Sequence, residues 1–208
     1  MSHHHHHHAH GQDEAFWDQM WSQRPRRREE PHDFLAESAA ALIPGAALDV
    51  GCGEGTDALW LATRGWTVTA VDVSKVALDR ARSADRAQRV TWIHANLNAW
   101  RPPFDTYDLV VAQFLHVPPG ERPSFFDALA RAIRLGGTLL FSAHAPPGSG
   151  ITVDRPAIAD LYFSADEVVR ALPGRWEVVI AGEQARVAHT HDGPRQDRDT
   201  VVNARRIG

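Results

Sequence analysis

Short apolar runs alternate with segments of helical periodicity along most of the chain. Runs rich in β-branched and apolar residues are typical of buried strands, whereas apolar residues three and four positions apart indicate helices. Strands are predicted at 46–50, 67–73, 89–95, 107–114, 138–144, 176–182 and 199–207. Helices are predicted at 33–43, 56–65, 74–85, 121–134 and 164–172.

This alternation predicts one α/β domain. Strands that alternate with helices form a mostly parallel sheet with helices on both faces, because right-handed crossovers return each strand to the side of its predecessor. The last two strands have no helix between them, so they are expected to pair as a hairpin with the final strand antiparallel. We therefore expect a single doubly wound, mostly parallel, Rossmann-like sheet of seven strands.

The ends of the chain divide it into three parts. His3 to His8 form a run typical of an affinity tag, so residues 1–11 are left out of the functional argument. Residues 12–32 are predicted to be irregular, because charges and prolines separate the aromatic residues there. Residues 33–208 are expected to form the folded domain.

Composition restricts the class of partner. The formal net charge of −4 disfavours a general nucleic-acid binder, which usually has a basic surplus. No apolar run approaches the roughly 20 residues that span a bilayer. Cys52 is the only cysteine, which excludes an intrachain disulfide and a cysteine-based zinc site. The histidines at 189 and 191 have no fourth ligand at suitable spacing, so no metal site is predicted. A single cysteine and the lack of a membrane-spanning run lead us to expect a cytoplasmic protein.

The stretch "LDVGCGEG" at 48–55 carries the first functional signal. Gly51, Gly53 and Gly55 stand at alternate positions directly after a predicted strand. Each glycine costs about 0.5–1 kcal/mol relative to alanine in regular structure, so their use needs a reason. In doubly wound sheets the loop after the first strand passes under a bound ligand, and side chains there would either fill the ligand's volume or forbid the required backbone angles.

Two carboxylates help to identify that ligand. Asp72, near the end of the second strand, can hold ribose hydroxyls through two acceptor oxygens. Asp49 lies two residues before Gly51, where it would repel a pyrophosphate but not a ligand with an ammonium and a sulfonium. The dinucleotide pattern G-x-G-x-x-G is also broken, because Thr56 stands where the third glycine belongs.

The segment "ALDVGCGEGTDALWLATRGWTVTAVDVS" resembles the first motifs of class I S-adenosylmethionine-dependent methyltransferases, and "YDLVVAQFLHVPPGER" and "LGGTLLFSAH" resemble later ones. The chain is most similar to the small bacterial branch of tellurite-resistance and thiopurine methyltransferases, which also have an N-terminal segment like "MWSQRP". The resemblance implies S-adenosylmethionine as cofactor, S-adenosylhomocysteine as product, and a small-molecule methyl acceptor.

The resemblance also implies roles for individual residues. The backbone of the loop would hold the methionine part of the cofactor, Asp72 the ribose, and the residues after the second and third strands the adenine. Trp21 and Arg24 would fold over the cofactor as a lid, and the end of the fourth strand would approach the methyl group. The cofactor set is thus Trp21, Arg24, Asp49, Gly51, Cys52, Gly53, Asp72, Val73, Asn96, Leu97 and Gln113.

The acceptor is expected beside Phe114, His116 and His144, at the ends of two neighbouring strands. His116 is the candidate general base, since the ordinary pKa of histidine suits proton uptake near neutral pH. The methylated atom stays open between sulfur, oxygen, nitrogen and a selenium or tellurium oxyanion, as does the choice between monomer and homodimer. The alternatives are a catalytically silent S-adenosylmethionine-binding module and a nicotinamide-dependent oxidoreductase.

Overall fold

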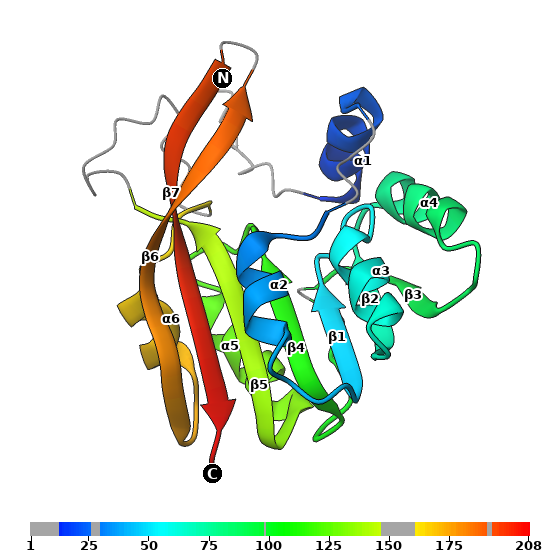
Figure 1. The fold of residues 1–208 in the computed structure, drawn as a ribbon. Helices are drawn as coiled ribbons and strands as arrows, with labels where there is room; N and C mark the ends of the chain where they lie inside the picture. The colour runs from blue at the N-terminus through cyan, green and yellow to red at the C-terminus, as the bar shows by residue number, and fades with distance from the viewer. Residues whose placement is uncertain (1–12, 26–29, 98, 147–160, 191–192) are drawn as a thin grey trace, which may run out of the picture.

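The computed structural model describes residues 13–25, 30–97, 99–146, 161–190 and 193–208 (Figure 1). The histidine run at 3–8, and His191 with Asp192, lie outside these ranges. The described helices are α1 (Glu14–Gln23), α2 (Asp33–Ala39), α3 (Thr56–Thr63), α4 (Lys75–Ala84), α5 (Arg122–Ala132) and α6 (Ala165–Ala171). The described strands are β1 (Ala46–Val50), β2 (Thr67–Asp72), β3 (Val90–His94), β4 (Tyr107–Gln113), β5 (Ile133–His144), β6 (Trp176–Thr190) and β7 (Gly193–Arg206).

These strands form one sheet in the order β3-β2-β1-β4-β5-β7-β6. Strands β1 to β5 pair in parallel, and β7 runs antiparallel to both β5 and β6. The strand order reverses between β1 and β4, and ligands of such sheets bind outside the carboxyl ends of the strands at this switch point. The predicted fold class is confirmed.

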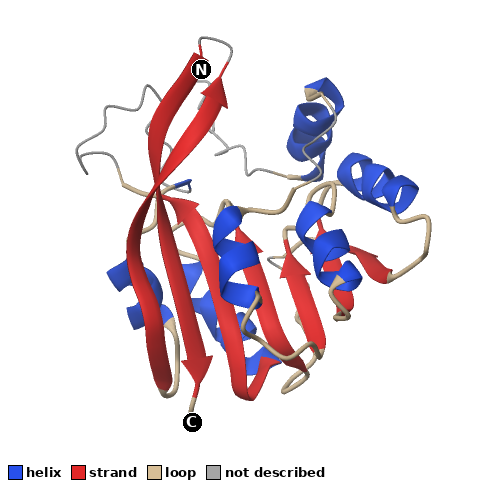
Figure 2. Cartoon of the chain, in the orientation of Figure 1, coloured by secondary structure: helices blue, strands red, loops and turns tan. Residues whose placement is uncertain are grey.

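Helices cover both faces of the sheet, with α2, α3 and α4 on one face and α5 and α6 on the other (Figure 2). Successive residues of β1 divide between the faces: Leu48 packs in the same cluster as Phe126 of α5, and Ala47 packs with Leu61 of α3. Fully burying a side chain the size of leucine contributes about 1.5–3 kcal/mol. A slip of one residue would turn these side chains to the wrong faces, so burial fixes where the loop after β1 begins.

The N-terminal segment differs from the irregular conformation predicted for 12–32. Glu14–Gln23 is a helix that begins after Asp13, whose carboxylate accepts a hydrogen bond from the backbone N–H of Phe16 at 3.0 Å. Trp17 and Trp21 are one turn apart, so both indoles lie on one side of α1. The charged residues between the aromatics concealed this period in the sequence.

The final hairpin is longer than predicted. Strand β6 continues to Thr190 and β7 begins at Gly193, where a connecting loop was expected. Arg186 lies opposite Asp197 with their side chains 3.3 Å apart, and Arg198 bonds to Glu183 at 2.8 Å. Opposite charges across strands stabilise a pair by about 0.2–1 kcal/mol. A polar sequence thus forms strands that extend beyond the rest of the sheet (Figure 1).

The region around Gly136 also differs from expectation. Helix α5 ends at Ala132 and β5 begins at Ile133, five residues earlier than the predicted strand. Gly136 has φ of 83°, and the register with β4 shifts between Tyr107 and Leu109. The glycines that indicated a break therefore mark an irregularity within the ladder, as glycine in a strand often does.

Candidate active site

The loop after β1 turns on three glycines with left-handed backbone angles. Gly51, Gly53 and Gly55 have φ of 68°, 53° and 75°, which residues with a side chain rarely adopt. The N–H groups of Gly51 and Cys52 both donate to the carbonyl of Val71, at 2.8 and 3.1 Å. The loop is therefore folded back onto the end of β2, and these two amides hold it there.

Packing within the protein accounts for two of these glycines. A Cβ at Gly51 would lie 1.9 Å from Cδ2 of Leu115, and a Cβ at Gly55 would lie 2.3 Å from Cη2 of Trp92. The glycines were predicted either to leave room for a ligand or to allow backbone angles that a side chain forbids, and their left-handed φ values agree with the second reason. At Gly51 and Gly55 the protein's own side chains already require glycine, while the backbone of the loop remains at the switch point.

Gly53 lies between the end of β2 and the N-terminal helix. Its N–H donates to Oδ2 of Asp72 at 2.7 Å, and a Cβ here would lie 2.8 Å from Cζ2 of Trp21. Oδ1 of Asp72 accepts from the N–H of Ser74 at 2.8 Å. Burial raises the pKa of Asp72, and backbone hydrogen bonds from Ser74, Gly53 and Val73 oppose the rise. The carboxylate holds the loop and the start of α4, and its further lone pairs can accept from a ligand's hydroxyls.

Asp49 and Cys52 are both buried, with exposed fractions of 3% and 6%. The thiol of Cys52 lies 3.8 Å from the carbonyl oxygen of Gly53, and the side chain packs in the core on the α2–α3 face. Cys52 therefore lines the loop through its backbone alone. Asp49 places a buried carboxylate directly before the loop, which disfavours a polyanionic ligand there.

The predicted adenine residues lie at the ends of β2 and β3, which are neighbouring strands. Nε2 of His94 lies 3.0 Å from the carbonyl oxygen of Val73, which links the two strand ends. Leu97 is half-buried against the core beneath α5, and Asn96 is exposed on the same edge. The structure thus brings Val73, Asn96 and Leu97 to one edge, and their binding of adenine stays a prediction.

Gln113, at the end of β4, is oriented by hydrogen bonds on both sides of its amide. Its Nε2 donates to Oδ2 of Asp57 at 2.8 Å, and its Oε1 accepts from the hydroxyl of Ser142 at 2.9 Å. Asp57 lies in the first turn of α3 and also faces the backbone N–H of His32 at 3.4 Å. Gln113 is therefore a rigid connection between α3 and β5 at the edge of the sheet.

Phe114, which follows β4, lies close to His144 at the end of β5, as expected for neighbouring parallel strands. Its ring centroid lies 4.9 Å from that of His144 and 5.1 Å from that of His32. Phe114 also has φ of 52°, and such strain in a residue other than glycine costs about 1–3 kcal/mol. Strained residues of this kind are concentrated at functional sites, and the position of the acceptor beside Phe114 stays a prediction.

His116 packs edge-on against Trp17 of α1, with ring centroids 4.7 Å apart. Burial lowers the pKa of His116 to about 4, and the charges of His144 and Arg24 add to the decrease. The two predicted imidazoles are thus close enough for one to affect the charge of the other. At neutral pH His116 is neutral, and it is a weaker base than its ordinary pKa suggested.

Helix α1 is fastened to the start of α4 by Asp18. Oδ1 of Asp18 accepts from the hydroxyl of Ser74 at 2.6 Å and from the backbone N–H of Val76 at 3.0 Å. A carboxylate at this place caps a helix N-terminus and meets its partial positive charge. The contact holds the N-terminal segment over the carboxyl end of β2.

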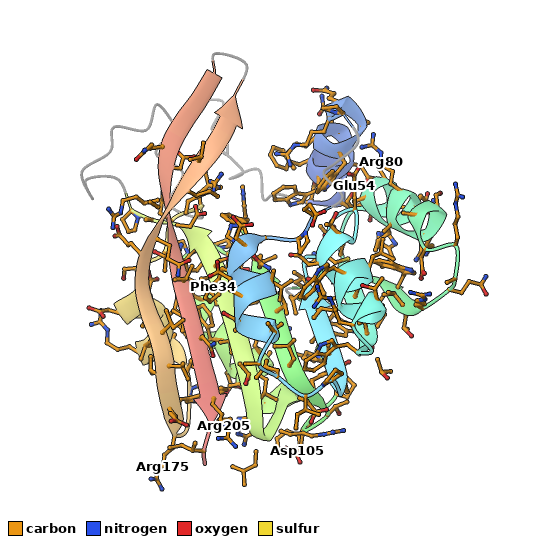
Figure 3. All side chains as sticks on the ribbon, viewed as in Figure 1. Phe34, Glu54, Arg80, Asp105, Arg175 and Arg205 are labelled. Carbon is orange, nitrogen blue, oxygen red and sulfur yellow. The ribbon has the colours of Figure 1, made fainter. Side chains whose placement is uncertain are left out.

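The predicted lid residues lie at the end of α1. The guanidinium carbon of Arg24 is 5.2 Å from the ring centroid of Trp21. The carbonyl of Arg24 accepts from Arg80 at 3.3 Å, and Arg80 pairs with Glu54 of the glycine loop at 2.6 Å. Figure 3 shows Glu54 and Arg80 at the junction of α1 and α4. Burial lowers the pKa of Arg24, while the charge of Glu54 opposes that change.

Sequence reasoning missed several charged residues of this edge. Asp18 was concealed in a segment predicted to be irregular, although its place between two tryptophans on a helix was the available signal. Asp199 of β7 was placed at the start of a strand with no role, and Arg186 was placed in a loop. The residues missed are Asp18, His32, Asp57, Arg186, Asp197 and Asp199.

Known proteins resemble this chain over its central part. Residues 47–137 match a family described as "Methyltransferase domain". The ubiquinone biosynthesis O-methyltransferase of Alkalilimnicola ehrlichii is 32% identical over 135 residues, which are 61% of this chain and 53% of that protein. The chain spans about half the length of the curated relatives it matches.

Two solved structures share the fold over almost the whole chain. One comes from work on the conversion of a disulfide bond into a thioacetal group during echinomycin biosynthesis; it has a TM-score of 0.73 at 25% identity and covers 93% of this chain and 92% of its own. TehB from Haemophilus influenzae has a TM-score of 0.74 at 19% identity, covering 93% of this chain and 66% of its own. The chain therefore has the fold of class I methyltransferases, as predicted, and its residues 47–137 match a methyltransferase domain.

In the part of the chain that the structure describes, every helix is too short or too polar to span a bilayer. No group of three or more histidine, cysteine, aspartate or glutamate side chains there is arranged to hold a metal ion.

Proposed function

We propose that the protein transfers a methyl group from S-adenosylmethionine to a small-molecule acceptor. The observation that carries this proposal is the bond from Gly53 to Asp72, which joins the glycine loop after β1 to the carboxylate at the end of β2. Both residues lie at the switch point of the sheet and inside the matched methyltransferase domain. The matched relatives and structural neighbours support the same reaction.

The residues at this edge fit the cofactor. Asp72 has further lone pairs for ribose hydroxyls, and Val73 and Leu97 offer apolar surface to adenine, with the Asn96 amide beside them. Asp49 provides a buried carboxyl group near the positively charged methionine part. The backbone carbonyls of the loop complete this set, since the N–H groups of Gly51 and Cys52 are used to hold the loop.

We infer that the described part of the N-terminal segment, residues 13–25, closes over the bound cofactor. Trp21 lies against Gly53, and Arg24 lies beside it, where a carboxylate of the cofactor would meet a guanidinium. Such closure removes water from the reacting groups and strengthens the electrostatic interactions inside. The N-terminal tryptophan segment is also the feature that supports the tellurite-resistance and thiopurine branch.

S-adenosylmethionine supplies a methyl group on a positively charged sulfur. The protein has to hold the acceptor atom in line with the leaving sulfur at roughly 3–3.5 Å, and alignment alone can contribute about 7–11 kcal/mol. Gln113 and Phe114 suit this task, because hydrogen bonds fix one side chain and aromatic neighbours fix the other. The relative named as an O-methyltransferase supports an oxygen acceptor.

Calorimetry on the purified protein tests the proposal. S-adenosylhomocysteine is expected to bind with micromolar affinity and NAD is expected not to bind; tighter binding of NAD would contradict the proposal. A screen with labelled S-adenosylmethionine against thiols, phenols, amines and selenium or tellurium oxyanions then identifies the acceptor class. Cofactor binding without transfer to any class would instead support the silent binding module.

A further inference from the structure

A buried carboxylate lies among three basic side chains at the acceptor edge. Asp199 of β7 has an exposed fraction of 1%. Its Oδ1 lies 3.6 Å from Nδ1 of His144 at the end of β5, and its Oδ2 lies 3.5 Å from Nε2 of His32, which precedes α2. Arg186 of β6 bonds to the same carboxylate through Nε and through Nη2. The cluster is thus assembled from four separate elements.

This cluster surrounds the residue expected to face the methyl group. The ring of Phe114 lies close to both His144 and His32, and the guanidinium carbon of Arg186 is 5.6 Å from its centroid. Phe114 follows β4, and β4 is the neighbour of β1, the strand that leads into the glycine loop. The cluster therefore belongs to the acceptor side of the proposed cofactor site.

The charges of the cluster favour proton uptake by an imidazole. Burial alone would raise the pKa of Asp199, but the facing side chains of His144 and His32 and the hydrogen bonds from Arg186 outweigh burial and lower the pKa below its usual value. Asp199 is therefore ionised at neutral pH. Arg186 is shared with a second buried carboxylate, Asp197, at 3.3 Å. A buried, ionised carboxylate stabilises an imidazolium beside it, and the carboxylate of Asp199 facing Nδ1 of His144 at 3.6 Å favours a proton on Nδ1, which leaves Nε2 as the basic nitrogen.

We propose that His144, held by Asp199, removes the proton of a phenol-type hydroxyl while that oxygen is methylated; the inference rests on the proposed methyl transfer. The oxygen forms a bond to the methyl carbon, and the carbon–sulfur bond breaks with its electron pair going to sulfur. The O–H proton goes to Nε2 of His144. One positive charge thereby passes from sulfur to the imidazolium, where the negative carboxylate of Asp199 balances it.

The acceptor class follows from this assignment. A thiolate or an oxyanion of selenium or tellurium arrives without a proton to lose, so a buried imidazole–carboxylate pair would serve no purpose. A hydroxyl compound gains most from it, since a positioned base contributes about 10²–10⁴-fold in rate. The aromatic rings of Phe114 and Trp17 suit a flat, apolar acceptor body.

The first test needs no turnover. Full-length protein saturated with S-adenosylhomocysteine is mixed with 4-nitrophenol at a pH below the solution pKa of the phenol, and the visible absorbance of the phenolate is recorded. We expect the protein to increase the ionised fraction, and His144→Gln to abolish the increase. Nitrogen NMR of labelled histidine, assigned with the same variant, should show His144 with Nδ1 protonated, and Asp199→Asn should remove that preference.

The second test compares two acceptors. His144→Gln should lower kcat for 4-methylphenol, which stays protonated at neutral pH, by about 10²–10⁴-fold but for 4-nitrothiophenol, which is ionised there, by less than about threefold. Affinity for S-adenosylhomocysteine within about threefold of the parent shows that the variants fold. Asp199 is a positioning residue, so Asp199→Asn should change kcat more than KM. If the Asp199→Asn variant does not fold, the result for His144→Gln alone tests the proposal.

Three results would overturn the inference while leaving the cofactor assignment intact. They are cofactor binding without any binding of 4-nitrophenol, an unchanged ionised fraction, or equal losses for the phenol and the thiol in His144→Gln. Failure of the protein to bind S-adenosylhomocysteine would instead contradict the proposed function itself.

Discussion

The indole of Trp21 covers Gly53 so closely that a Cβ at Gly53 would lie 2.8 Å from Cζ2 of the ring. The other side of Gly53 is held by the carboxylate of Asp72. One position of the loop is therefore fixed from the sheet and covered from the N-terminal helix. A cofactor above the loop must share this space with the indole, so its binding and the position of α1 are expected to depend on each other.

Two glycine substitutions separate ligand contact from packing. Gly53→Ala would displace Trp21, and we expect it to weaken the binding of S-adenosylhomocysteine at least tenfold, about 1.4 kcal/mol. In Gly55→Ala, the new Cβ would lie 2.3 Å from the ring of Trp92, and the residue would have to keep a φ of 75°. It should lower the free energy of unfolding by about 1–3 kcal/mol and leave the affinity of the folded protein nearly unchanged. Calorimetry and urea unfolding measure the two effects, and equal affinity in the two variants would contradict the distinction.

Asp72→Ala tests the ribose contact. Loss of hydrogen bonds to a charged acceptor costs roughly 1.5–3 kcal/mol, so affinity for S-adenosylmethionine should fall about 10- to 150-fold. Ser74→Ala is the comparison variant, because it leaves the carboxylate of Asp72 in place and removes only the hydroxyl that accepts from the N–H of Ala77 and donates to Asp18. Calorimetry on both variants gives the comparison. Affinities that fall equally in both would mean that Asp72 only holds the loop and the start of α4.

Limited proteolysis tests the closure of the N-terminal segment. Cleavage between Trp17 and Arg28 should slow markedly when S-adenosylhomocysteine is added, because Trp21 and Arg24 then have a ligand to cover. Asp18→Ala should speed cleavage, since it removes the bonds to Ser74 and Val76. Asp79→Ala is the control, because Asp79 lies on the exposed side of α4. The same rate with and without ligand would exclude a lid.

His116 should make stability depend on pH. Its pKa is about 4 in the folded protein, against an ordinary value of 6.5. The unfolded chain therefore binds more protons between these values, so the free energy of unfolding falls as pH drops from 6.5 to 4, by about 3 kcal/mol in total. His116→Gln should lack this decrease in urea unfolding measured across that range. A parent protein without the decrease would contradict the lowered pKa.

The same variant tests the catalytic role first assigned to His116. A base with a pKa near 4 is poorly matched to proton uptake at neutral pH, so we expect His116→Gln to lower kcat for a phenol by less than about tenfold. His144→Gln, measured under the same conditions, is expected to lose far more. A loss of about 10²–10⁴-fold in His116→Gln would return the general base to His116.

The sequence by itself determined the sheet, the glycine loop and the carboxylates near it. Apolar periodicity is local, so the alternation of strands and helices predicted the parallel order and the hairpin at the end. Gly51, Gly53 and Asp72 follow strand ends, and parallel strands bring those ends to one edge. Because β4 and β5 were expected to be neighbouring parallel strands, Phe114 and His144 at their ends were predicted to lie close together.

Tertiary structure alone decided which charged residues join that edge. Asp199 meets His32 and His144 because a long hairpin returns to β5, and its length depends on cross-strand pairs such as Arg186 with Asp197. Asp18 acquires its role only when α1 docks on α4. These contacts join segments far apart in the chain, and their energies come from burial and charge in the folded state, which local periodicity does not contain.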